Sequence, residues 1–114
     1  AIHYAKIIID KFLEIPVSPD VYLNVNIPAV KQEEIKGIKF SGQGKGQWIK
    51  EFEERRDPYG FNYYWMTGEF FNNEPDNELA DHNLIARNYI SIVPHKIDTT
   101  DYTELKRLEG LWKL

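Results

Sequence analysis

The most informative stretch of this sequence is Asn88-Tyr89-Ile90-Ser91-Ile92-Val93-Pro94, which is followed by Asp98-Thr99-Thr100-Asp101-Tyr102. Its β-branched and aromatic residues predict a short strand, and we expect Pro94 to end it because proline lacks a backbone donor. Asp101 stands three residues before Glu104, a spacing typical of a capping box at a helix start. The stretch therefore predicts a strand that leads into a helix from Asp101 to about Glu109.

Three further segments upstream have clear periodicity. Residues 1–14 carry apolar side chains at three- and four-residue spacing, which predicts an amphipathic helix. That helix would begin without a capping side chain, so we expect that part of the protein precedes it. Residues 21–27 alternate apolar and polar side chains and predict a strand that ends at Pro28, and residues 37–41 predict a second short strand.

Two aromatic-rich segments, 47–56 and 61–70, flank the sequence Asp57-Pro58-Tyr59-Gly60. Proline and glycine at these positions are typical of a tight turn, so the segments predict a β-hairpin over about residues 47–70. The following residues, 71–81, are acidic and predict a solvated loop.

Length and composition suit a single domain region that spans residues 1–114. The formal charge of -4 and the pI near 5.4 argue against a nucleic-acid partner, which normally requires a basic patch. The sequence lacks an apolar run of about 20 residues, so it predicts no membrane span and no membrane partner. Because it also lacks cysteine and a signal-peptide pattern, we expect a cytoplasmic protein.

Few residues suggest chemistry of their own. The sequence Gly42-Gln43-Gly44-Lys45-Gly46 could form a phosphate-binding loop, but a hairpin rather than a helix follows it, so a plain connection is favoured. His82, together with Asp81, Asp76 and Glu78, could hold a metal ion, although their spacing also suits an ordinary polar loop. The pair Asp98 and Asp101 resembles an acid and base pair, but Asp101 is explained more simply as a helix cap. His3 and His95 have no nucleophile or second ligand at a recognisable spacing.

The hairpin carries more aromatic surface than a two-stranded ribbon can bury against one small core. We expect a subunit contact there, and the alternatives are packing within the same chain and, less favoured, base stacking. The C-terminal helix has an apolar stripe that must also be buried, either against a neighbouring subunit or against its own. The predicted oligomer interface thus comprises Trp48, Phe52, Tyr63, Trp65, Tyr102, Leu105 and Leu108.

Several motifs, taken in order, resemble the second half of the SurE survival-protein family. They are Leu23-Asn24-Val25-Asn26-Ile27-Pro28, Gly37-Ile38-Lys39-Phe40 with Gln43-Gly44, Phe52 through Gly60, Tyr63-Tyr64-Trp65, Gly68-Glu69-Phe70, and Tyr89 through Pro94 with Asp98 and Thr100-Asp101-Tyr102. The resemblance covers nearly the whole sequence. It departs from the family at Asn88, where glycine is usual, and in the segment from Glu78 to Arg87.

This resemblance implies a Rossmann-like α/β fold with a projecting hairpin and a C-terminal helix used in oligomer assembly. It also implies a hydrolase: a metal-dependent 5′/3′-nucleotidase and acid phosphatase that converts nucleoside monophosphates to nucleoside and phosphate. The divalent metal, Mg²⁺ or Mn²⁺, is held in the family by an Asp-Asp-Gly motif, a serine and an asparagine of its first half. None of these motifs is present in this sequence, so we assign it no catalytic and no metal-binding residue.

Two functional hypotheses follow. The chain is either part of a SurE-like nucleotidase, in which it completes the fold and the oligomer and pairs with a missing N-terminal half, or a catalytically inactive binding or assembly module. In the first case the chain alone is expected to be inactive.

Overall fold

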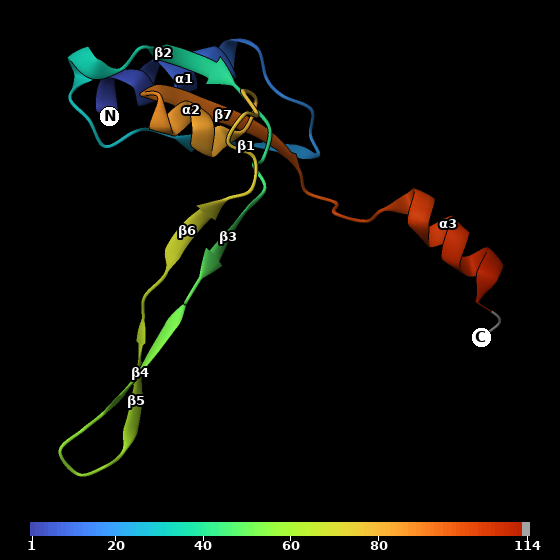
Figure 1. Ribbon diagram of the computed structural model, residues 1–114. Helices are drawn as coiled ribbons and strands as arrows, with labels where there is room; N and C mark the ends of the chain where they lie inside the picture. The colour runs from blue at the N-terminus through green and yellow to red at the C-terminus, as the bar shows by residue number, and fades with distance from the viewer. Residues whose placement is uncertain (113–114) are drawn as a thin grey trace. The chain divides into compact units, whose positions relative to one another are not determined.

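A computed structural model describes residues 1–112 and shows a mixed α/β fold (Figure 1). Its elements are α1 (Ile2–Glu14), β1 (Val21–Asn26), the short 3-10 helix η1 (Gln32–Glu34), β2 (Gly37–Phe40), β3 (Gly46–Ile49), β4 (Phe52–Arg56), β5 (Asn62–Met66), β6 (Glu69–Asn72), α2 (Asp81–Ala86), β7 (Tyr89–Lys96) and α3 (Tyr102–Leu111). The chain divides into two compact units, Ala1–Asn24 with Pro94–Leu114, and Val25–Val93. The boundaries between the units fall within β1 and β7.

The central sheet has the strand order β1-β7-β2. Within the unit of residues 25–93, β2 pairs with β7 in parallel, from Gly37 opposite Tyr89 to Phe40 opposite Ile92. Parallel neighbours require a long crossover connection, which is the hallmark of α/β folds. The pairing agrees with the Rossmann-like architecture that the resemblance implies.

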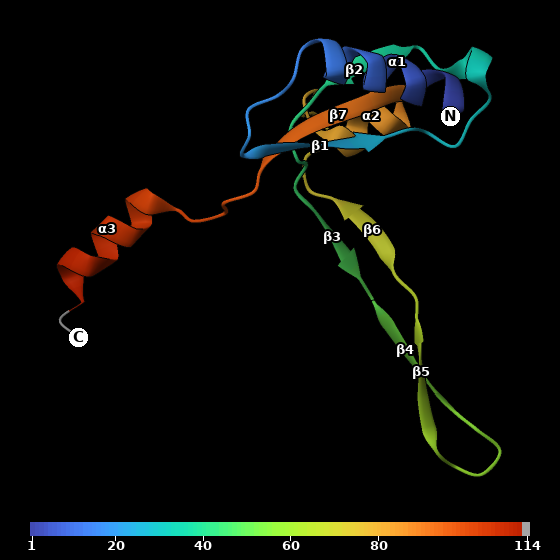
Figure 2. The same cartoon turned by 180° about the vertical axis from the view of Figure 1, so that it is seen from behind.

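The core of this unit forms where β7 meets α2. Residues 90–93 of β7 are all buried, and so are Ala80 and Leu84 at the start and in the middle of the helical turn. Figure 2 shows α2 lying beside β7. The buried hydroxyl of Ser91 is satisfied by the Ser41 hydroxyl, 2.6 Å away.

A two-stranded antiparallel arm is inserted between β2 and α2 (Figure 1). Its inner part pairs β3 with β6, and its outer part pairs β4 with β5. The tip is the predicted turn, closed by a hydrogen bond of 3.0 Å from the Gly60 amide to the Asp57 carbonyl, with Gly60 at a positive φ of 89°. The predicted hairpin is therefore present, and it runs from Gly46 to Asn72.

The arm is interrupted once, where the sequence predicted continuous strands. Lys50 has a φ of 53° and Gly68, across the arm, a φ of 148°. The pairing on either side keeps one register, since Ile49 lies opposite Glu69 and Phe52 opposite Met66. The Thr67 amide still donates to the Glu51 carbonyl at 2.9 Å, so the strand pairing is interrupted at Lys50 and Gly68 without a shift in register.

Pro94 does not end its strand, and β7 continues to Lys96. Because the Ser41 amide donates to the Ile92 carbonyl, the even-numbered residues of β7 point their backbone groups toward β2. The paired part of β2 ends opposite Ile92. The missing donor of Pro94 therefore falls beyond the end of β2, where a proline removes no hydrogen bond of the ladder.

In the unit of residues 1–24 and 94–114, the chain around Asp20 runs beside the end of β7. The Ile97 amide donates to the Asp20 carbonyl at 2.9 Å, and the Tyr22 ring stacks on His95 with 5.2 Å between ring centres. The predicted N-terminal helix is α1, in which Ala5 and Ile8 are partly buried whereas Ile9 and Phe12 remain exposed. Gly110 lies inside α3, so that helix reaches Leu111 rather than ending near Glu109.

The segment 71–81 is not a simple loop. Phe71 and Asn72 belong to β6, and Asp81 opens α2, a short helix that the sequence analysis did not predict. Among the helices within residues 1–112, none is both long and apolar enough to span a membrane.

Candidate functional site

Polar groups concentrate at the base of the arm, where the chain enters β3 and leaves β6. The base is closed by backbone hydrogen bonds from the Gly42 amide to the Leu79 carbonyl (2.8 Å) and from the Asp81 amide to the Gly42 carbonyl (3.0 Å). Gly42 and Ala80 form a parallel bridge there. The glycine-rich segment of residues 42–46 is thus attached directly to the start of α2.

Two carboxylates accept hydrogen bonds from the glycine-rich segment. The Gly44 amide donates to Asp81 Oδ1 at 3.0 Å, and the Lys45 amide donates to Glu74 Oε2 at 2.5 Å. The bond from Lys45 is the main reason that the pKa of Glu74 lies below its usual value. Since these amides face protein carboxylates, the structure favours the plain connection over the phosphate-binding loop at this segment.

A network of side-chain amides surrounds His82. Its Nε2 lies 2.7 Å from Asn72 Oδ1, and Asn72 Nδ2 donates to Asn83 Oδ1 at 2.7 Å. Asn83 Nδ2 in turn donates to the carbonyls of Glu74 (2.7 Å) and Asn77 (2.8 Å). The imidazole also contacts the Phe70 ring edge-on, at 5.3 Å between centres. The network ties β6, the acidic loop and α2 together.

A concave region of about 450 Å³ opens beside His82. It lies at the end of β1, and its lining combines three apolar side chains with an amide, a carboxylate and an imidazole: Val25, Asn26, Ile27, Asp81, His82 and Ile85. A few polar groups in a largely apolar, concave lining are typical of small-molecule sites. This region is the candidate functional site of the chain.

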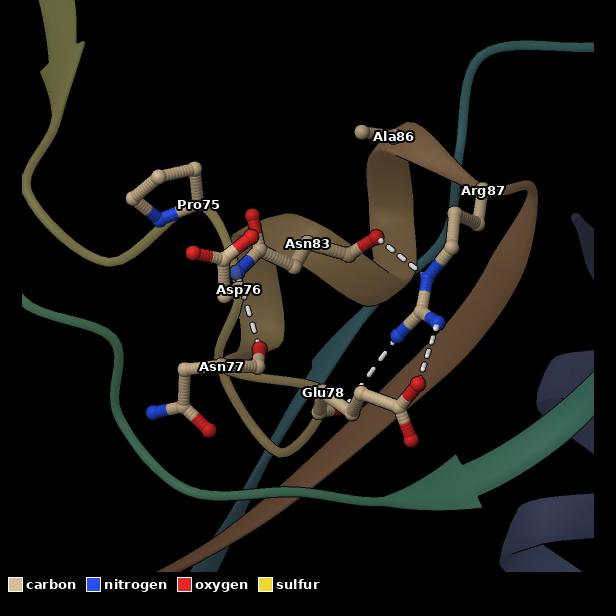
Figure 3. Close-up of a pocket in the computed structure, with 7 residues that line it drawn as sticks. All are labelled: Pro75, Asp76, Asn77, Glu78, Asn83, Ala86 and Arg87. Carbon is tan, nitrogen blue, oxygen red and sulfur yellow. Dashed lines mark hydrogen bonds and ion pairs between the residues drawn. The ribbon is translucent and has the colours of Figure 1, made fainter.

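A second concave region, of about 390 Å³, lies on the acidic loop and α2 (Figure 3). Arg87 crosses it, and its guanidinium donates to the carbonyls of Asn83 and Glu78, each at 3.2 Å. Asp76 and Glu78 line this region, whereas His82 lines the one beside β1. The imagined metal set of Asp76, Glu78, Asp81 and His82 is therefore divided between two places.

The residues present do not fit the divalent metal that the resemblance implies. Within residues 1–112, no three side chains of His, Asp or Glu lie close enough together to hold a metal ion. Asp81 Oδ1 is already occupied by two backbone amides, those of Gly44 and His82.

The aromatic residues predicted as a subunit contact lie along the arm. Trp65 stands opposite Glu53 and Tyr63 opposite Arg55, so both rings share one face, whereas Phe52 stands opposite Met66 on the other face. Trp48 contacts Phe70 edge-on at 5.8 Å. All four keep between 42% and 61% of their surface exposed, so packing within the described chain covers them only in part.

The other three predicted contact residues lie on α3. Leu105 and Leu108 line a shallow concave region of about 310 Å³ together with Glu109 and Trp112. The Tyr102 hydroxyl instead donates to Asp98 Oδ2. The apolar stripe predicted for this helix is thus divided: the two leucines line the concave region, whereas Tyr102 binds Asp98. Leu105 remains 45% exposed.

The remaining titratable candidates have structural roles in the described chain. Asp101 caps α3, and its Oδ1 accepts hydrogen bonds from the amides of Thr103 (3.0 Å) and Glu104 (2.9 Å). Hydrogen bonds from the Thr100 side chain, the Tyr102 hydroxyl and the Thr100 amide lower the pKa of Asp98 to about 2. A carboxyl held so far in its charged form is poorly suited to acid and base work near neutral pH. His95 stacks on Tyr22, and His3 contacts Tyr4 edge-on.

Sequence reasoning missed Asn72 and Asn83, which hold the His82 ring. The sequence does contain a short signal for helix α2. Ala80 and Leu84 are four residues apart, and Asp81 stands where a helix start favours an acid. Six residues are too few for periodicity to separate a helix from a loop, so the contribution of Asn83 depended on an element that was not predicted.

Comparison with known proteins supports one family. No family model matches the chain. The chain is 39% identical over 111 residues to the 5′-nucleotidase SurE of Flavobacterium johnsoniae. This match covers 97% of this chain and 42% of that protein. It is 44% identical over 102 residues to the 5′-nucleotidase SurE of Carboxydothermus hydrogenoformans, covering 90% of this chain and 38% of that protein. The chain therefore spans about two fifths of the length of these relatives.

A solved structure gives the same result for the fold. The crystal structure of the SurE protein from Aquifex aeolicus matches with a TM-score of 0.74 and 35% sequence identity, over 96% of this chain and 44% of that one. The predicted resemblance and the predicted fold class are both confirmed. This chain is a SurE-like α/β segment, similar over nearly all of its residues to part of the SurE 5′-nucleotidases.

Proposed function

We propose that this chain is one part of a SurE-type nucleotidase that hydrolyses nucleoside monophosphates. The observation that carries the proposal is the agreement of sequence and fold with SurE proteins over nearly the whole chain. In this proposal the chain completes the sheet through β7 and β2 and supplies the arm and α3 for assembly of a homo-oligomer. The region beside Asn26 and His82 would then form a wall of the substrate site.

The proposal places the divalent metal, Mg²⁺ or Mn²⁺, on residues outside this chain. It therefore requires a second segment, the N-terminal half of the same protein, which would carry an Asp-Asp-Gly sequence. It also places the complete enzyme in the cytoplasm. The length of the curated SurE relatives, of which this chain spans about two fifths, supports the need for such a segment.

Phosphatase assays on two proteins test this proposal. The 114-residue chain is expected to show no turnover of an aryl phosphate or of AMP with added Mn²⁺ or Mg²⁺. A longer protein that restores the upstream segment is expected to hydrolyse both, and to lose activity when its Asp-Asp pair is changed to Asn-Asn. Turnover by the short chain above a metal-free control would contradict the division of roles. Inactivity of a folded longer protein would favour the inactive binding or assembly module.

A further inference from the structure

The region beside Asn26 and His82 is lined by a negative charge that no positive charge balances. Its polar groups are a carboxamide, the Asp81 carboxylate and an imidazole, and no Lys or Arg among the described residues lines it. A phosphate monoester carries a charge of about −1.5 to −2 at pH 7, so the carboxylate repels it. The region is therefore unsuited to the phosphate group of a nucleotide.

The carboxylate of Asp81 is held in place with one oxygen left over. Its Oδ1 accepts from the Gly44 amide at 3.0 Å and from the His82 amide at 2.7 Å. These bonds leave Oδ2 open, and the side chain keeps 22% of its surface exposed. An ionised carboxylate can only accept, and hydrogen bonds to it are stronger than those between neutral groups. Oδ2 is thus a positioned acceptor for a hydroxyl group.

The His82 ring is a fixed part of the wall rather than a group that a ligand can bind. Its Nε2 lies 2.7 Å from Asn72 Oδ1, and its Nδ1 lies 3.5 Å from Asp81 Oδ1. A methyl group added at Gly44 would lie 2.0 Å from Nδ1, so the imidazole rests on the glycine backbone. The polar groups that remain for a ligand are Asp81 Oδ2 and the Asn26 carboxamide.

Of the three parts of a nucleoside monophosphate, the ribose suits this lining best. Its hydroxyls can donate to a carboxylate, and they can both donate to and accept from a carboxamide. Its carbon atoms suit the aliphatic side chains of Val25, Ile27 and Ile85. A base stacks best on aromatic rings, whereas most of this lining is aliphatic or polar.

We propose that this region binds the ribose of the substrate and that Asp81 and Asn26 determine the affinity for it. The 2′-hydroxyl, which is free in both 5′ and 3′ monophosphates, donates to Asp81 Oδ2, and Asn26 binds a neighbouring polar atom of the nucleoside. The inference rests on the proposed function, because it takes a nucleoside monophosphate as the substrate. The phosphate is then bound by residues outside this region.

Titration calorimetry with two nucleosides tests the ribose site without a phosphate group. The protein is the longer one that restores the upstream segment. Adenosine is expected to bind about tenfold more tightly than 2′-deoxyadenosine, because the deoxy compound lacks one hydrogen bond to a charged acceptor. Asp81→Asn keeps an oxygen for the amides of Gly44 and His82 but loses the charge, and is expected to remove most of this preference.

Hydrolysis by the same protein gives a second readout. Asn26→Ala is expected to raise the ratio of the KM for AMP to the KM for an aryl phosphate about tenfold, because the aryl compound has no ribose. Its effect on kcat is expected to be smaller. Asn73→Ala and Asp76→Asn change exposed side chains outside the region and are the matched controls, which are expected to leave the ratio unchanged.

The outcomes separate the ribose site from the proposed function. Equal affinity for adenosine and 2′-deoxyadenosine, or a KM ratio that does not change in a folded Asn26→Ala protein, overturns the ribose site even when the protein hydrolyses AMP. A longer protein that hydrolyses neither AMP nor the aryl phosphate contradicts the proposed function, and the two nucleoside titrations still decide on the ribose site. The comparison of the two nucleosides in the unaltered protein also decides where Asp81→Asn fails to fold.

Discussion

Asn88 has a backbone conformation that most residues avoid. Its φ is 64°, directly after the C-terminal end of α2, and its amide and carbonyl are both hydrogen bonded, to the Ile85 carbonyl and from the Lys36 amide. Glycine and asparagine are the residues that tolerate this left-handed region after a helix. The asparagine that departs from the usual family glycine thus satisfies the same backbone requirement.

This requirement predicts opposite results for two substitutions of Asn88. Asn88→Ala is expected to lower the free energy of unfolding by about 1 kcal/mol, because alanine has a steric penalty in the left-handed region. Asn88→Gly, the control, is expected to change it by less than about 0.5 kcal/mol. Urea unfolding of the three proteins measures the difference, and equal stability of the Ala and Gly variants would contradict the argument.

Asp98 gives a prediction about pH. Its pKa of about 2 lies below its ordinary value of 3.8, because the Thr100 side chain, the Tyr102 hydroxyl and the Thr100 amide donate to its carboxylate. A lowered pKa means that the folded state favours the charged form, so this local stabilisation is complete above pH 3.8 and is lost as the pH falls toward 2. Tyr102→Phe removes one of the donors and is expected to raise the pKa of Asp98. A titration followed by carboxyl ¹³C shifts measures it, with Tyr59→Phe at the tip of the arm as control.

At the scale of elements, the two ends of α3 differ in how well the sequence predicted them. Asp101 caps the helix as expected, but Glu104 does not complete a capping box, because both of its carboxylate oxygens bind the Arg107 guanidinium, at 2.7 and 2.5 Å. This pair raises the pKa of Arg107 and lowers that of Glu104. Arg107 therefore competes with the backbone for the Glu104 carboxylate. The spacing of Asp101 and Glu104 alone could not reveal this competition.

The cap of α3 can be tested by itself. Asp101→Ala removes the acceptor for the amides of Thr103 and Glu104 and is expected to cost about 0.5 to 2 kcal/mol of helix stability. Asp101→Asn keeps a side-chain oxygen that can cap and is expected to stay near the unaltered protein. Circular dichroism against temperature compares them, and an equal loss in both variants would show that charge rather than capping stabilises the helix start.

Strands and turns with strong local signals were predicted well from the sequence, whereas features that depend on neighbours were not. The turn at Asp57 to Gly60 was predicted from its own residues. The continuation of β7 past Pro94 depends on where β2 ends, and the interruption at Lys50 and Gly68 depends on pairing across the arm. The site beside His82 depends on α2, whose six residues are too few to show a period.

At the scale of the whole molecule, the exposed rings of the arm carry the prediction of assembly. Trp65 keeps 55% of its surface exposed on the face that it shares with Tyr63, and Arg55 lies 5.7 Å from its ring. Large aromatic surfaces left open in one chain favour a partner, and we predict that this partner is a second copy of the protein.

In a complete SurE-type protein, Trp65→Ser is expected to shift sedimentation toward smaller species because it removes apolar contact area from that face. Tyr59→Ser at the tip, outside the predicted contact, is the matched control and is expected to leave the distribution unchanged. An unaltered distribution for a folded Trp65→Ser protein would count against a subunit contact at the arm.

The bridge between Gly42 and Ala80 also has a consequence for the order in which the chain folds. The strands β2 and β7 are parallel partners separated by the whole stretch from Ser41 to Asn88, and closing so long a loop is entropically costly and slow. An antiparallel hairpin forms from neighbouring residues within about 1 to 10 μs. Once the arm has formed and Gly42 meets Ala80, only the short segment of α2 separates the two ends. We therefore expect the arm to fold first, and to act as a shortcut that brings β7 to β2.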